Sequence, residues 1–92
     1  MFLTDHEAYV FFQLGKLWGS YNKAKYILEF PLKRWCIRAY RNPPEPLLME
    51  ELEDLLDDAS EFYHRADIQN EEVNAEAQQL VAYVMEAINA RV

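Results

Sequence analysis

The sequence predicts an all-α protein, folded as one small compact bundle of four to five helices. Apolar residues recur at spacings of three and four along most of the chain, which is the period of one helix face. Two glycines and four prolines among 92 residues are too few turn residues for a many-stranded β fold. We therefore expect residues 1–92 to form a single helical domain.

Capping residues and helix breakers set the expected helix bounds. Thr4 and Glu7 have the spacing of a capping box, and Gly19 is expected to end the first helix. Pro31 suits the first turn of the third helix, because its missing N–H has no partner there in any case. A stiff proline-rich connector at 42–46 follows. The expected helices cover residues 4–18, 21–29, 31–41, 47–65 and 70–91.

Each of four helices is expected to bury one apolar stripe. The first comprises Ala8, Phe11, Phe12, Leu14, Gly15 and Trp18. The face of the third helix comprises Leu32, Cys36, Ala39 and Tyr40. The acidic helix contributes Leu48, Leu52, Leu55, Ala59, Phe62 and Ala66. The last helix contributes Val73, Ala77, Leu80, Val84 and Ala87.

The stripe of the last helix is wider than one packing contact requires. Val81, Met85, Ile88 and Val92 extend it. One hypothesis is that this helix contacts both the core and a second subunit, as in a two-fold homodimer. The other is that it packs only within one small bundle.

Charge is segregated along the chain. The net charge of −7 divides into −2 over residues 1–15, +6 over residues 16–41 and −11 over residues 42–92. The sequence thus predicts a basic helix pair at 20–41 followed by acidic helices at 47–92. Ordinary solvated helix faces would account for the same pattern.

The basic segment predicts a contact with nucleic acid. Basic side chains on neighbouring helical turns can neutralise several phosphates, and arginine can pair with guanine edges. The candidate nucleic-acid-binding residues are Lys23, Lys25, Lys33, Arg34, Arg38 and Arg41.

Residues 19–44 resemble the helix-turn-helix of small phage repressors of the Cro type. Ala24, Ile37 and the basic run Arg41-Asn42-Pro43-Pro44 stand at the distances of that motif. Leu28 stands where the motif has its turn glycine, and Arg34 stands where it has an apolar residue. The resemblance implies a DNA-binding transcription regulator with Lys33, Arg34 and Arg38 near the groove.

The acidic half predicts a different partner. Carboxylates three and four residues apart lie 5–6 Å from one another on a helix, roughly as phosphates do along a strand. Such a face could bind a basic, nucleic-acid-handling protein, as small phage inhibitors of the DNA-mimic, anti-restriction or anti-CRISPR kind do. Its candidate residues are Glu50, Glu53, Asp54, Asp57, Asp58 and Glu61. A third hypothesis is a subunit or adaptor whose contacts are Phe2, Tyr9, Tyr21 and Tyr26.

Little in the sequence points to catalysis, so we expect a protein that is not an enzyme. There is no glycine-rich phosphate loop, and neither serine lies in a nucleophile elbow. Glu61 and His64 make one Glu-x-x-His pair, whereas a di-iron bundle needs two, so no metal and no cofactor are expected. Cys36 alone can form no internal disulfide. Without a signal sequence or membrane span, we expect a cytoplasmic protein with no membrane partner.

Overall fold

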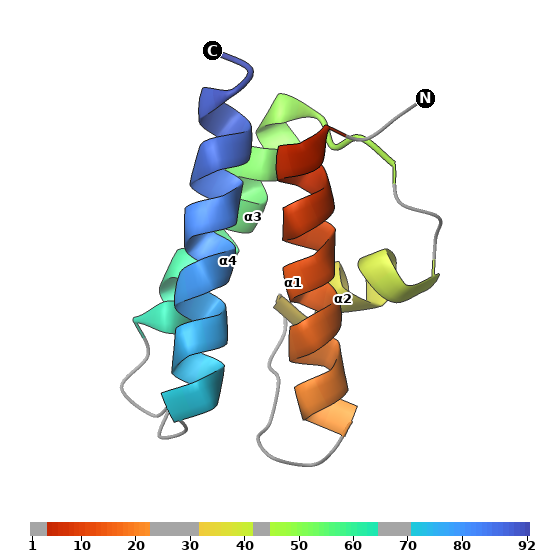
Figure 1. Cartoon of the computed structure of the whole chain (residues 1–92), viewed down its shortest axis with the longest axis vertical. Helices are drawn as coiled ribbons and strands as arrows, with labels where there is room; N and C mark the ends of the chain where they lie inside the picture. The colour runs from red at the N-terminus through yellow and green to blue at the C-terminus, as the bar shows by residue number, and fades with distance from the viewer. Residues whose placement is uncertain (1–3, 23–31, 42–44, 65–70) are drawn as a thin grey trace.

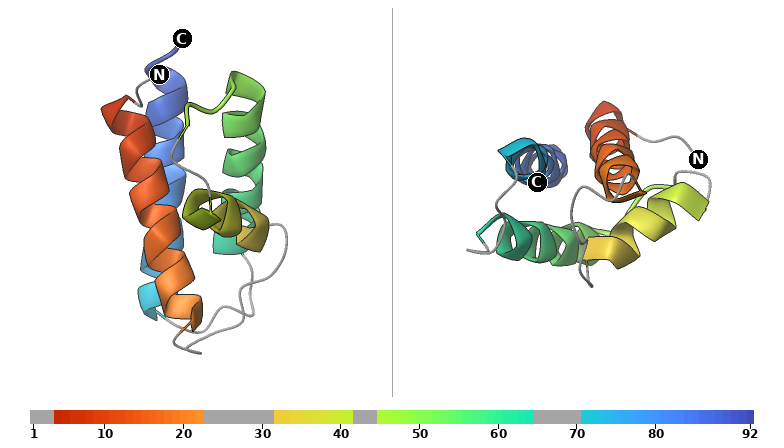
Figure 2. Two further views of the ribbon diagram at one scale, coloured as in Figure 1. Left: turned by 90° about the vertical axis from the view of Figure 1, so that its right-hand side faces the viewer. Right: turned by 90° about the horizontal axis from the view of Figure 1, so that it is seen from below.

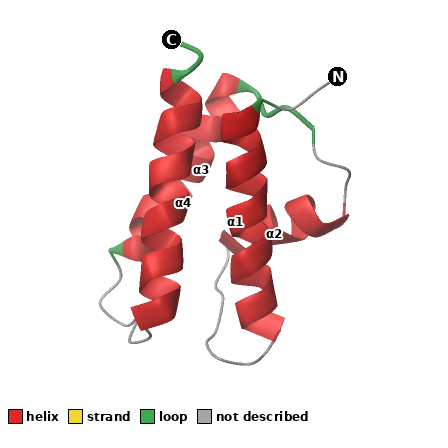
Figure 3. Cartoon of the chain, viewed as in Figure 1, coloured by secondary structure: helices red, strands yellow, loops and turns green. Residues whose placement is uncertain are grey.

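The computed structural model describes residues 4–22, 32–41, 45–64 and 71–92, without the side chains of residues 21, 22 and 41. Within these ranges the chain forms helices and loops and no strand, as Figure 3 shows, which confirms the predicted all-α class. The predicted helix 21–29 and most of the proline-rich connector lie outside the described residues, apart from Tyr21 and Asn22 in the first helix. The helices are α1 (Asp5–Asn22), α2 (Leu32–Arg41), α3 (Met49–Tyr63) and α4 (Glu71–Asn89).

The four helices form two layers. The long helices α1 and α4 lie side by side and antiparallel, and α3 and α2 form the layer behind them (Figures 1 and 2). α4 packs against α1 and α3, and the short α2 closes the ring by contacting α1 and α3. The Cα radius of gyration is 12.4 Å, close to the ~12 Å expected for a compact chain of this length.

The predicted stripe of α4 is confirmed, because all five of its residues are at most 2% exposed. In α3, four of the six predicted residues are buried: Leu52, Leu55, Ala59 and Phe62. Leu48 is 62% exposed instead, since it is the N-cap of α3, and the preceding Leu47 fills the core. Ala66 lies outside the described residues.

The predictions for α1 were wrong in two respects. The helix continues through Gly19 to Asn22. Its buried face is also rotated from the predicted one: of that stripe, only Leu14 is fully buried, Phe11 and Trp18 are partly buried, and Phe12 is 61% exposed. The buried residues are Glu7, Val10, Gln13, Leu14 and Leu17.

Two polar side chains on this buried face have partners on α4 or just beyond it. Gln13 Nε2 donates a hydrogen bond to the Glu76 carbonyl oxygen over 2.9 Å. The Glu7 carboxylate forms an ion pair with the Arg91 guanidinium, and only 3% of its side chain is exposed. Pairing of this kind offsets the desolvation of a buried charge.

Only one of the two hydrogen bonds of the predicted capping box forms at the N-terminus of α1. The Glu7 backbone N–H donates to Thr4 Oγ1 over 3.2 Å, as predicted. The Glu7 side chain reaches Arg91 through Oε1, while its other oxygen, Oε2, has no hydrogen-bond partner among the described residues. Glu7 therefore connects the first turn of the chain to its last residues.

The buried face of α2 is shifted from the predicted one. Leu32 and Cys36 are at most 1% exposed, and Trp35 joins them at 6%. Tyr40 is 73% exposed, which corrects its placement in the core, and its ring lies 6.0 Å from that of Trp18. Burial raises the pKa of the Cys36 thiol to about 12.

We predict that Arg91→Ala destabilises the protein, because it leaves the Glu7 carboxylate buried and unpaired. The expected loss in the free energy of unfolding is about 1–3 kcal/mol, measured by urea denaturation. Adding Glu7→Gln to Arg91→Ala should recover part of the loss, since the unpaired charge is then gone. Equal stability of Arg91→Ala and the wild type would contradict this account.

We predict that the Cys36 thiol lowers the stability at high pH. Its pKa rises from an ordinary value of 9.0 to about 12 in the folded protein, so above pH 9 the unfolded chain loses a proton that the folded chain keeps. The thiol then reduces the free energy of unfolding by up to about 1.4 kcal/mol per pH unit. Urea denaturation between pH 8 and 11 should show that the free energy of unfolding falls more steeply with pH in the wild type than in Cys36→Ala. Parallel pH profiles would count against the prediction.

Candidate interaction surface

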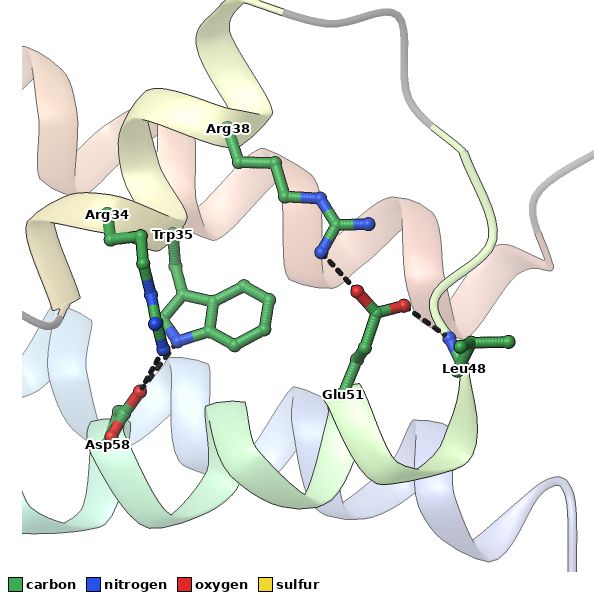
Figure 4. Close-up of polar contacts among 6 residues, drawn as sticks. All are labelled: Arg34, Trp35, Arg38, Leu48, Glu51 and Asp58. Carbon is green, nitrogen blue, oxygen red and sulfur yellow. Dashed lines mark hydrogen bonds and ion pairs between the residues drawn. The ribbon is translucent and has the colours of Figure 1, made fainter.

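α2 is joined to α3 by polar contacts along one side (Figure 4). The first contact is an ion pair between Arg38 Nη1 and Glu51 Oε2 at 2.5 Å. The other oxygen of the same carboxylate accepts a hydrogen bond from the Leu48 N–H over 2.8 Å. Glu51 therefore caps the N-terminus of α3 and holds α2 at the same time.

The second contact lies two turns further along α3, at Asp58. Asp58 Oδ2 accepts a hydrogen bond from Trp35 Nε1 over 2.7 Å and lies 3.5 Å from Arg34 Nη2 (Figure 4). The indole needs this acceptor because Trp35 is almost fully buried. One carboxylate thus satisfies a buried donor and neutralises an exposed arginine.

Trp35 also contacts both guanidinium groups. The Arg34 and Arg38 carbons Cζ lie 5.3 Å and 5.7 Å from the centre of its ring. Distances of this size allow cation–π attraction. Both arginines are therefore held by the same Trp35 ring, and each is also held by its own carboxylate on α3.

The pKa of the Glu51 carboxyl is lowered from its ordinary 4.5. The main cause is the hydrogen bond from Arg38, followed by the one from the Leu48 backbone, and both outweigh the desolvation that acts the other way. A lowered pKa means that Glu51 stabilises the fold above pH 4.5 and loses this contribution as the pH falls through its folded-state pKa.

The structure describes three of the six predicted nucleic-acid-binding side chains. The Arg34 and Arg38 side chains are 54% and 36% exposed, and Lys33 is half-buried. Lys23 and Lys25 lie outside the described residues, as does the side chain of Arg41. The two described arginines do not form a separate basic surface, because each faces a carboxylate of α3.

The predicted acidic residues of α3 fall into two groups. Asp58 faces α2, together with Glu51, which was missing from the predicted set. The position before a core residue does not single out this pair in the sequence, because Asp54 and Glu61 also directly precede core residues, Leu55 and Phe62, and are likewise seven residues apart. The remaining five are exposed and form no ion pair with any described residue: Glu50, Glu53, Asp54, Asp57 and Glu61. We call these five the outer carboxylates.

Other candidate groups show no arrangement for chemistry in the described part of the chain. No group of three or more His, Cys, Asp or Glu side chains there could hold a metal ion. Ser20 donates to the Glu76 carboxylate over 3.4 Å, and the His64 ring packs edge-on against Tyr63. None of the helices described has the length and apolar character to cross a membrane.

Comparison of the chain with protein-family models, curated proteins and solved structures finds no match. The resemblance of residues 19–44 to Cro-type repressors therefore stays a prediction.

We predict a measurable coupling between Arg38 and Glu51 in a double-mutant cycle of Arg38→Ala and Glu51→Gln. The glutamine keeps an oxygen for the Leu48 N–H and removes only the charge. Because both side chains are partly exposed, the expected coupling is about 0.5–1 kcal/mol in the free energy of unfolding at pH 7. The coupling should weaken as the pH falls below 4.5 and disappear once the pH lies below the folded-state pKa of Glu51.

The matched control is a cycle of Arg38→Ala with Glu50→Gln, since Glu50 is exposed and forms no ion pair with a described residue. Equal coupling in both cycles would mean that general charge, and not this contact, is responsible.

Proposed function

We propose that the protein is a small, non-enzymatic helical binding protein whose outer carboxylates bind a basic segment of a partner that handles nucleic acid. The observation that carries this proposal is that the charged side chains of α2 and α3 differ in their pairing within the molecule. The described arginines of α2 are already paired within the molecule, whereas the outer carboxylates of α3 are exposed and unpaired among the described residues.

The α2–α3 contact supports the proposal, because it is an example of the same chemistry. α2 is a basic, amphipathic helix, and it docks on α3 by offering guanidinium and indole donors to two carboxylates. The outer carboxylates repeat this spacing on the solvent side of α3. A basic helix or loop of another protein could bind them by the same charge-assisted hydrogen bonds.

The charge of the whole chain also favours a basic partner over nucleic acid. With a net charge of −7, the chain repels a polyanion at long range and attracts a basic surface. Competition acts in the same direction, since a phosphate has to displace Glu51 and Asp58 before it reaches Arg38 or Arg34.

A nucleic-acid contact through α2 is the second candidate, and one observation favours it. More than half of the Arg34 side chain is exposed to solvent, although its Nη2 lies 3.5 Å from Asp58 Oδ2. A duplex that bound here would use Lys33, Arg34 and Arg38, with a phosphate taking the place of the carboxylates.

The test is fluorescence anisotropy with two labelled probes, an octa-arginine peptide and a mixed-sequence DNA duplex, each at two salt concentrations. We expect the peptide to bind more tightly than the duplex. Asp54→Asn with Asp57→Asn should weaken peptide binding about fivefold, since two exposed ion pairs contribute about 1 kcal/mol together. Gln78→Lys with Gln79→Lys is the matched control, because it changes the net charge equally on exposed positions of α4.

Equal weakening by the two double variants would refute a specific α3 surface. Duplex binding that is tighter than peptide binding, falls steeply with salt and is lost in Arg34→Ala with Arg38→Ala would establish the second candidate instead.

A further inference from the structure

The outward face of α1 carries four exposed side chains that the proposed function does not use. Asp5, Tyr9, Phe12 and Lys16 follow one another at spacings of four, three and four, so they lie in one row along the helix. Tyr9 is 50% exposed and Phe12 is 61% exposed. Beside the row lies Gly15, where an added Cβ would meet nothing within 4 Å. The row is therefore accessible to another helix.

The row is complementary to itself when read in the opposite direction. If a second copy of α1 lies antiparallel, with the two-fold axis between residues 10 and 11, Asp5 of each copy faces Lys16 of the other. The same operation places Phe12 of each copy opposite Tyr9 of the other. Such a pattern, in which residue i meets j and j meets i, is what an isologous two-fold interface requires.

Charge further favours a second copy as the occupant. The chain has a net charge of −7, so two copies repel each other when α3 surfaces meet. The row on α1 carries one acid and one base, and neither is in an ion pair with a described residue. Antiparallel approach on this face replaces like-charge repulsion with two opposite-charge pairs.

Each ring of the row already has a contact within the molecule. Tyr9 stacks on Tyr83 of α4 with 5.4 Å between ring centres, and Lys16 Nζ lies 5.0 Å from the centre of the Phe12 ring. Rings with fixed positions lose less conformational entropy on binding. α3 lies in the other layer of the molecule (Figure 2), so the face is separate from the outer carboxylates.

We propose that α1 forms a two-fold antiparallel contact with α1 of a second copy, through Asp5–Lys16 ion pairs and Tyr9–Phe12 ring contacts. This inference does not depend on the proposed function. A single pair of helices buries less than the roughly 800 Å² per partner of a standard interface, so we expect dissociation constants of about 10 μM to 1 mM.

The test is sedimentation equilibrium of the full chain from about 10 μM to 1 mM, at low salt. The wild type should shift from 10.9 kDa toward twice that mass. Asp5→Lys and Lys16→Asp should each weaken the dimer at least tenfold, because like charges then meet twice. An equimolar mixture of the two variants should dimerise again, since opposite charges meet at both positions.

Two further variants separate this contact from loss of folding and from general charge effects. Phe12→Ser should abolish the dimer with unchanged helical circular dichroism, because the ring is exposed. Glu53→Lys makes the same net charge change as Asp5→Lys but lies on α3, so it should leave the dimer intact. A wild type that stays monomeric at 1 mM would overturn the proposal and leave the face to another partner. A dimer insensitive to Asp5→Lys, or a mixture that fails to dimerise, would also overturn it.

Discussion

The fold depends on one helix, α4, that packs against two others along a single stripe. α1 and α3 both contact α4, and its buried stripe includes two small residues, Ala77 and Ala87, among larger ones. Alanines at 2% exposure or less let two helices approach the same face closely, which a stripe of leucines alone would prevent. α2 does not contact α4 and closes the ring against α1 and α3 instead. It buries Leu32, Trp35 and Cys36 there, and the contacts of Arg34, Trp35 and Arg38 join it to α3.

The sequence predicted the helices with a sharp polar–apolar contrast and failed where two faces competed. In α3 and α4 nearly every predicted core position is buried, because acids and amides mark the other side clearly. α1 has apolar residues on both sides, and its true inner face includes Glu7 and Gln13. An argument from periodicity assigns polar residues to the solvent side, so it predicted that the face with Phe12 is buried. Only the tertiary partners, Arg91 and the Glu76 carbonyl, show why two polar side chains point inward.

The candidate surface shows a similar limit. The charges of residues 16–41 and 42–92 were visible in the sequence, but sequence order does not show that α2 turns back onto α3. In the folded protein Arg34 pairs with Asp58 and Arg38 pairs with Glu51. Part of the predicted basic surface and part of the acidic helix therefore form one contact. The outer carboxylates are exposed, as expected from the sequence, and no described residue covers them.

The ion pair between Glu7 and Arg91 joins positions that are 84 residues apart along the chain and adjacent in space. The start of α1 and the end of α4 therefore lie at the same end of the molecule. A short peptide could link them, and the chain could then be opened at a new point between two other helices without changing the order of helices around the core. For the same reason, the whole domain could be inserted into a surface loop of another protein, entering and leaving through one narrow opening. The covalent order of the helices is thus less constrained than their packing.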